Sequence, residues 1–131
     1  MARAIVMRAP GGPEVLRVEQ VSVGEPHVGE VRMRQTGIGV NFHDVYVRSG
    51  LYRTLPLPGV PGIEGVGVVD AVGPGVNHVK IGVGYVTSAY GGYADARLVD
   101  VELLIRLPDA VDDRTAAATL LRGTNSLTLA C

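Results

Sequence analysis

The chain has 131 residues, of which 47% are apolar, and its formal net charge at pH 7 is −1. This length suffices for one domain with its own hydrophobic core. The twelve basic residues are scattered among thirteen acidic ones, so the basic face that nucleic-acid binding requires is not expected. No apolar run approaches the roughly eighteen residues of a membrane span, and no signal-peptide pattern stands at the N-terminus. We therefore expect a cytoplasmic protein that binds neither nucleic acid nor membrane.

The single cysteine is the last residue, Cys131, which excludes an internal disulfide and a cysteine-based metal cluster. Eighteen glycines and eight prolines are spread along the chain rather than gathered in one tract. Together with the high aliphatic content, this distribution indicates many tight turns between short strands rather than disorder.

The first predicted elements are three strands. Residues 2–8 and 15–23 are rich in Val and Ile and are separated by APGGPE, a strong turn signal. In residues 30–40, Val31 and Met33 alternate with charged residues, which is typical of a half-buried strand.

A short helix is predicted over residues 42–50, ending at Gly50. The segment LPLPGVPG, residues 55–62, is expected to be an extended loop. Residues 62–75 return to a strand, and their small side chains favour a tightly curved sheet. Further strands are predicted near 83–87 and 93–100, and a short one at 103–109.

The last part of the chain has helical character. Asp112 or Asp113 can cap a helix that begins near residue 114 and continues to Gly123. Many short strands at roughly ten-residue spacing predict a compact β-barrel. We therefore divide the chain into a barrel, residues 1–110, and a helical linker, residues 111–131.

Four Gly-x-Gly pairs suggest a dinucleotide-binding loop, but none is complete. Such a loop needs a third glycine three places further on, where a helix begins. Those positions hold Phe42, Asp70, His78 and Thr87. A Walker-type loop is excluded because Ile81 follows the only lysine, Lys80. The sequence thus contains no complete phosphate-binding motif.

The chemistry-bearing side chains concentrate between residues 39 and 67. His43 stands beside Asp44, and Glu64 follows behind a Pro-Gly turn. Adjacent side chains point apart, so we interpret His43 as a surface residue and Asp44 as structural. Glu64 lies in an apolar run and needs a partner, for which Arg48 is the candidate; an ion pair is favoured over catalysis.

His27 and His78 flank turn glycines and are expected to be solvated loop residues. Like His43, they are not expected to contribute to a metal site.

Several segments resemble the N-terminal half of the quinone oxidoreductases, in the medium-chain dehydrogenase/reductase superfamily. These segments are APGGPEVL, GVNFHDVYVRSGLY, PGIEGVGVVDAVGPGV, GGYADARLV and RLPDAVDD. The resemblance implies a mainly β, partly open barrel of GroES-like fold, with short helices and a C-terminal helical segment. It also implies that this half forms one wall of an active-site cleft. In the family a Rossmann domain that binds NADPH follows, and this chain ends before that domain would begin, so we expect the Rossmann domain to be absent.

The resemblance also bears on the metal question. Zinc-dependent members of the superfamily carry a cysteine and a histidine where this sequence has Asn41 and Ile63, and neither replacement is a zinc ligand. Asp44 and Glu64 match carboxylates that stand behind the zinc ligands. The site therefore resembles the zinc-independent branch.

The residues that match the family's cleft are Asn41, Tyr46 and Tyr52. The resemblance implies that the amide hydrogen-bonds a quinone oxygen or the cofactor ribose, and that the tyrosines stack on a flat substrate. Asn125 stands where the family commonly has a threonine. From the residues alone, Asn41 is equally a turn amide, and the tyrosines are equally core or rim aromatics.

The resemblance implies hydride transfer from NADPH to a quinone or related enone. Without a phosphate-binding loop, the isolated chain is expected to bind NADPH weakly and to be inactive. The alternative is a free-standing GroES-like binding module, in which exposed apolar residues of the terminal segment drive homo-oligomer formation. These residues are Ala116, Ala117, Leu120, Leu121, Leu127 and Leu129. A co-chaperonin role rests on the fold name alone and is least favoured.

Overall fold

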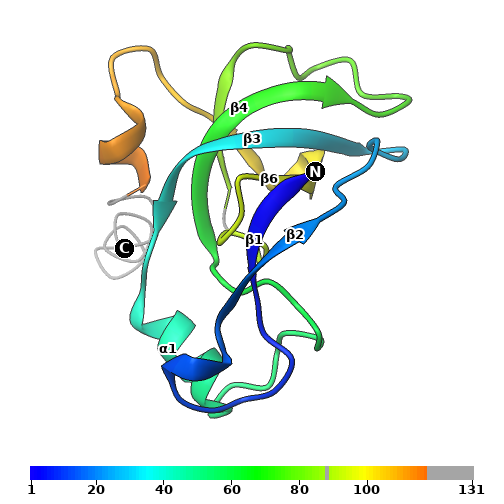
Figure 1. The fold of residues 1–131 in the computed structure, drawn as a ribbon. Coiled ribbons are helices and arrows are strands. Elements are labelled where there is room, and N and C mark those ends of the chain that lie inside the picture. Colours follow the sequence, from blue (N-terminus) through cyan, green and yellow to red (C-terminus); the bar gives the residue numbers. More distant parts are fainter. Residues whose placement is uncertain (88, 118–131) are drawn as a thin grey trace.

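The computed structural model describes residues 1–87 and 89–117 and consists mainly of β-strands in two sheets (Figure 1). The smaller sheet is the antiparallel pair β1 (Ala2–Val6) and β2 (Arg17–Val21). The larger sheet has five antiparallel strands in the order β6-β3-β4-β5-β7. Their bounds are β3 Glu30–Gly39, β4 Glu64–Val72, β5 Gly84–Thr87, β6 Ala96–Asp100 and β7 Leu104–Arg106. The 3-10 helices are η1 (Pro13–Val15) and η2 (Val101–Leu103), and the helix α1 spans Phe42–Ser49.

The two sheets are joined along β1. The backbone of Ile5 donates to the carbonyl of Tyr93 over 2.8 Å, and Asp95 donates to the carbonyl of Arg3 over 2.9 Å. In the part of the chain that the structure describes, the sheets do not close into a complete barrel. The prediction of a mainly β, partly open barrel with short helices is therefore confirmed.

Strands β3 and β4 form the longest pairing and curve strongly (Figure 1). Two register shifts, at Arg32/Met33 and Gln35/Gly37, interrupt the pairing, and such irregularities bend a strand. Val31 and Met33 are fully buried, in a core that also holds Val69, Val79, Tyr85 and Val99. The prediction of a half-buried strand over 30–40 is confirmed.

Helix α1 begins after the N-cap residue Asn41 and ends before Gly50, as predicted. Gly50 has a φ of 89°, a left-handed conformation that glycine adopts without strain and that commonly ends helices. At the other end, the carboxylate of Asp44 accepts the backbone N–H of Asn41, as in a capping box.

The described part of the C-terminal segment contains a helical turn at residues 113–117. Of the two caps that the sequence offered, Asp112 is the one used: its Oδ1 accepts the backbone N–H of Thr115 over 2.7 Å. This hydrogen bond holds the pKa of Asp112 below its usual value. The domain division at residue 110 stays a prediction, and residues 118–131, including Asn125, lie outside the described residues.

The helical turn packs on the large sheet, which corrects one expectation. Ala116 and Ala117 are each 6% exposed and contact Val66 of β4. Gly37 of β3 allows this approach, because a Cβ there would lie 3.1 Å from the Cβ of Ala117. These two alanines are therefore covered by the chain's own sheet and offer no surface for association. The leucines predicted to act with them lie beyond residue 117.

Candidate functional site

A hollow of about 420 Å³ opens at the end of β3, where the chain leaves the sheet for α1. Its volume is in the range of small-molecule sites. Its walls come from the end of β3, the cap of α1, the first residue of β4 and the turn at 113–117. The lining residues are Thr36, Gly37, Ile38, Gly39, Val40, Asn41, Glu64, Arg114 and Ala117. Asn41 was predicted for the cleft and is part of this lining, whereas Tyr46 and Tyr52 are not.

Asn41 joins two walls of the hollow. It caps α1 with an extended backbone (φ −129°, ψ 158°), and its side-chain Nδ2 donates to Glu64 Oε1 over 3.3 Å. Glu64 opens β4 opposite Gly39 and is only 3% exposed. The amide therefore acts both as the turn residue and as part of the hollow.

The expected ion pair between Glu64 and Arg48 is wrong for the described part of the chain, because no such pair occurs there. The Arg48 guanidinium instead donates to the backbone carbonyl of Gly11 over 2.8 Å. Arg48 lies in the last turn of α1, so this bond ties the helix to the loop before η1. Glu64 is buried as predicted, with the amide of Asn41 as a partner.

Asp44 is 5% exposed and is held by a residue that the sequence reasoning did not single out. Its Oδ2 accepts the phenol of Tyr93 over 2.6 Å, besides the backbone N–H of Asn41 over 3.0 Å. Burial, together with the hydrogen bond to Asp44, raises the pKa of Tyr93 well above its usual value. Asp44 is thus buried and hydrogen-bonded, and the motif GGYAD supplies its side-chain partner.

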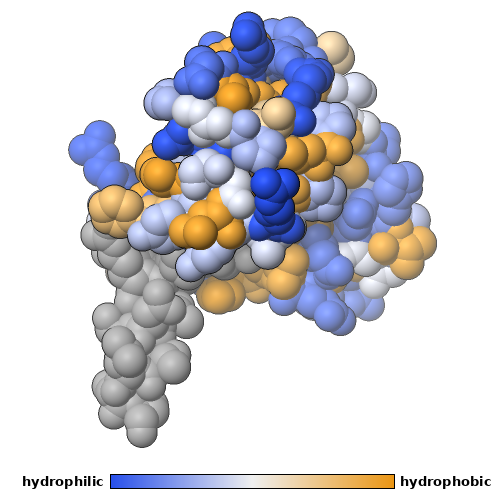
Figure 2. Space-filling view, turned by 90° about the horizontal axis from the view of Figure 1, so that it is seen from below, coloured by the Kyte–Doolittle hydropathy of each residue, from blue (hydrophilic) through white to orange (hydrophobic). Residues whose placement is uncertain are grey.

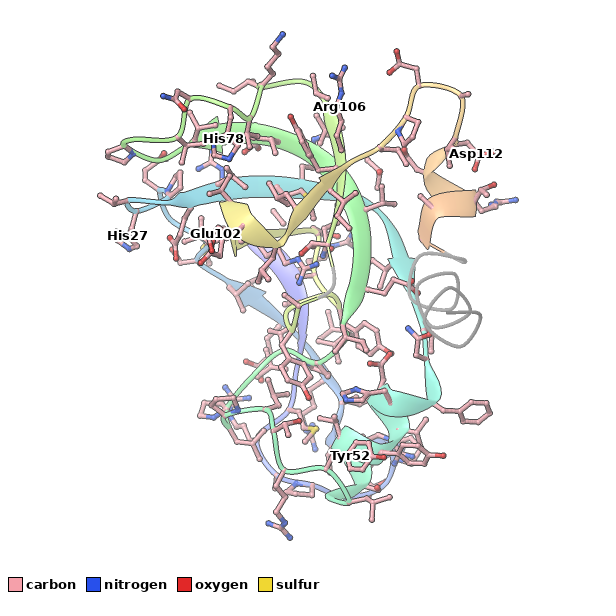
Figure 3. The ribbon with its side chains drawn as sticks, turned by 180° about the vertical axis from the view of Figure 1, so that it is seen from behind. His27, Tyr52, His78, Glu102, Arg106 and Asp112 are labelled. Atoms are coloured by element: carbon pink, nitrogen blue, oxygen red, sulfur yellow. The ribbon has the colours of Figure 1, made fainter. Side chains whose placement is uncertain are left out.

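Aromatic side chains gather around α1. The chain has six Phe and Tyr residues, and all except Tyr85 come from α1, the segment after it, or residues 90–93. The rings of Tyr46 and Tyr52 meet edge to face with centroids 5.4 Å apart, and the side chains are 39% and 44% exposed. Tyr52 lies at the α1 end of the molecule (Figure 3). Both half-exposed tyrosines therefore belong to the short helix-and-loop segment that follows Asn41.

His43, interpreted as a surface residue, is only partly exposed. Its ring lies 5.5 Å from that of Tyr52 and 6.0 Å from that of Tyr90. Its Nδ1 is buried without a hydrogen-bond partner among the described residues. The phenol of Tyr90 is itself hydrogen-bonded to the hydroxyl of Thr54. His43 is thus a member of the aromatic cluster, because α1 turns it towards the segment that carries Tyr90.

His27 and His78 are exposed at turns, as predicted, and lie at the end of the molecule opposite Tyr52 (Figure 3). Within residues 1–87 and 89–117, no three His, Cys, Asp or Glu side chains gather in a way that could hold a metal ion. No helix within these two residue ranges is long and apolar enough to cross a bilayer.

The four Gly-x-Gly pairs do not form a phosphate-binding loop in the described structure. Two pairs, 37/39 and 65/67, lie inside β3 and β4, and the other two lie before or within strand-to-strand connections. Only the pair 37/39 is followed directly by a helix, α1, but Phe42 stands where the third glycine of the motif would be. The described residues therefore contain no complete dinucleotide-binding motif.

Comparison with known proteins identifies the family. The profile of the alcohol dehydrogenase GroES-like domain matches residues 27–109. A quinone oxidoreductase of Pseudomonas aeruginosa is 45% identical over 128 residues, which cover 94% of this chain and 38% of that protein. A 2-haloacrylate reductase of a Burkholderia species is 40% identical over 130 residues, covering 94% of this chain and 39% of that protein.

Solved structures give the same result. The Escherichia coli quinone oxidoreductase complexed with NADPH superposes with a TM-score of 0.92 at 36% identity, covering 98% of this chain and 40% of that chain. This chain thus spans about two fifths of the length of the proteins it matches, and the matched part is their N-terminal one. The predicted resemblance is confirmed: the chain belongs to the alcohol dehydrogenase GroES-like domain family, and several of its relatives are quinone oxidoreductases.

Proposed function

We propose that this chain forms the substrate-side wall of an NADPH-dependent quinone oxidoreductase. A flat quinone or related enone would lie against Tyr46 and Tyr52, and the amide of Asn41 would hydrogen-bond a carbonyl oxygen of the ligand. Because one relative bears the name 2-haloacrylate reductase, activated alkenes belong to the proposed substrate class. In a complete enzyme, NADPH would supply the hydride.

The observation that carries this proposal is the half-exposed pair of tyrosines on α1, the helix that Asn41 caps, and on the segment directly after it. Buried aromatics would serve only the core, but these rings are 39% and 44% exposed while held edge to face. An aromatic ring fixed in this way offers a flat, amphipathic surface at little entropic cost. Apolar side chains also reach the surface between polar ones on the face seen from below (Figure 2).

In this proposal the chain contacts the substrate but does not hold the phosphates of NADPH. Since no glycine pair of the chain completes a dinucleotide-binding motif, the phosphates of NADPH would have to be held elsewhere, and this chain by itself would be catalytically silent. The proposal is also zinc-independent. Asn41 directs its amide N–H to Glu64, and Ile63 has no ligand atom, so the two positions do not fit a zinc ion.

The proposed site predicts a loss of affinity in Tyr52→Ala. We expect this variant to bind 2-methyl-1,4-naphthoquinone about tenfold more weakly than the wild-type chain, because a well-placed aromatic contact contributes about 1 kcal/mol or more. The dissociation constant is measured by NMR titration, following the backbone amides of α1.

Ile105→Ala is the matched control for this titration. Ile105 is 57% exposed on β7, next to Arg106, which lies far from Tyr52 (Figure 3). The control removes an exposed apolar side chain without touching α1 and is expected to leave the affinity unchanged. Equal affinities of Tyr52→Ala and Ile105→Ala would count against the proposed site.

A second candidate function is a free-standing binding module that associates with itself. It is favoured by three exposed apolar side chains where β3 runs into α1: Ile38, Val40 and Phe42, which are 42%, 72% and 75% exposed. An apolar row of this kind promotes association. Sedimentation velocity at two concentrations tenfold apart decides the question, since a monomer at both would remove this candidate.

A further inference from the structure

Tyr93 connects the sheet to the start of α1, although it is not part of the lining of the hollow. Its phenol donates to Asp44 Oδ2 over 2.6 Å, and the same oxygen accepts the backbone N–H of Asn41 over 3.0 Å. Asn41 in turn donates its amide to Glu64 over 3.3 Å. Hydrogen bonds therefore link Tyr93, through Asp44 and Asn41, to Glu64, and the last two residues line the hollow.

The backbone of Tyr93 is held firmly by its neighbours. Gln35 Nε2 donates to the carbonyls of Gly92 and Ala94, over 2.8 and 2.7 Å, and these two residues flank Tyr93. The carbonyl of Tyr93 itself accepts the N–H of Ile5 over 2.8 Å. Because the partly buried amide of Gln35 directs both N–H donors to this short segment, the segment has little conformational freedom.

The ring of Tyr93 is fixed as well. It packs directly on the backbone of Gly62, where a Cβ would lie 2.6 Å from the ring carbon Cδ1. Gly62 has a φ of 94°, so glycine is favoured there for its conformation as well as for its size. With backbone and ring both restrained, the phenol has one direction in which to donate, and Asp44 lies there.

We propose that Tyr93 is a positioning residue, which acts through Asp44 to hold the Asn41 amide in the hollow. Asp44 and Asn41 both belong to the start of α1, so their mutual hydrogen bond alone cannot fix that end of the helix relative to the sheet. The phenol of Tyr93 ties it to residues 92–94, and thereby sets the distance between Asn41 and Glu64. This inference rests on the proposed function for the identity of the ligand, though not for the hydrogen-bond path.

The test is Tyr93→Phe with Tyr85→Phe as matched control. Tyr85 is 6% exposed in the core, and its phenol oxygen accepts the backbone N–H of Lys80 over 3.2 Å. Each variant thus loses one hydroxyl that makes one hydrogen bond, but only Tyr93 reaches α1. The readouts are the side-chain amide resonances of Asn41 by NMR and the dissociation constant for 2-methyl-1,4-naphthoquinone.

We expect Tyr93→Phe to shift the Asn41 amide resonances and to raise the dissociation constant about fivefold, the equivalent of one ordinary hydrogen bond. Tyr85→Phe should leave both unchanged. Unmoved Asn41 resonances in Tyr93→Phe would overturn the proposal, and so would equal shifts in both variants, which would indicate general loosening. If the wild-type chain binds no quinone, the proposed function fails, and the Asn41 resonances alone decide the positioning role.

Discussion

Gly39→Ala is expected to lower the free energy of unfolding by about 3 kcal/mol, at the upper end of the cost of overpacking. A Cβ at this position would lie 2.6 Å from the backbone carbonyl oxygen of Ala117 and would also collide with the carboxylate of Glu64. The backbone of the helical turn cannot give way as a flexible side chain would, and Glu64 is buried. Urea denaturation measures the change.

Gly84→Ala is the control for this substitution. Like Gly39, Gly84 is a terminal residue of a strand, here the first residue of β5. A Cβ at Gly84 would meet nothing closer than Leu107 Cδ2 at 3.4 Å. The free energy of unfolding of Gly84→Ala is expected to stay within about 1 kcal/mol of the wild-type value. If the two variants unfold at the same urea concentration, the helical turn does not pack on β3 as closely as described, and the hollow loses its fourth wall.

The sequence predicted the elements whose signals are local. Alternating Val31 and Met33 have a strand's period of two, Gly50 ends α1 through its own conformation, and Asp112 caps the next helical turn with its own carboxylate. Each signal is complete within a few residues. The family resemblance then supplied the arrangement of these elements, which the local signals do not contain.

The sequence did not predict the partners that lie far apart along the chain. Tyr93 is 49 residues from Asp44, and Asn41 is 23 residues from Glu64. A buried carboxylate signals that it needs a donor, but not which one, and the candidate proposed for Glu64, Arg48, donates to the carbonyl of Gly11 instead. The alternation of adjacent side chains likewise did not show that His43 lies beside the rings of Tyr52 and Tyr90, of which Tyr90 comes from a distant segment.

Asp44→Ala is expected to destabilise the chain by about 3 kcal/mol, because a hydrogen bond to a charged group contributes roughly 1.5–3 kcal/mol and Asp44 accepts two. The substitution leaves the phenol of Tyr93 and the backbone N–H of Asn41 without an acceptor in a region from which water is largely excluded. Asp44→Asn retains an oxygen in place and should lose less. Urea denaturation of both variants gives the comparison.

The control is Asp95→Ala, which removes an exposed carboxylate instead of a buried one. Asp95 pairs with Arg3 over 3.1 Å, but the two side chains are 53% and 69% exposed, so water replaces the lost partner and stability should change little. Asp44 and Asp95 each accept one side-chain and one backbone hydrogen bond. A difference in stability between the two variants therefore reports on the burial of the carboxylate. If Asp44→Ala unfolds no more easily than Asp95→Ala, the start of α1 is held by its own helix alone. The amide of Asn41 would then be free to turn away from the hollow.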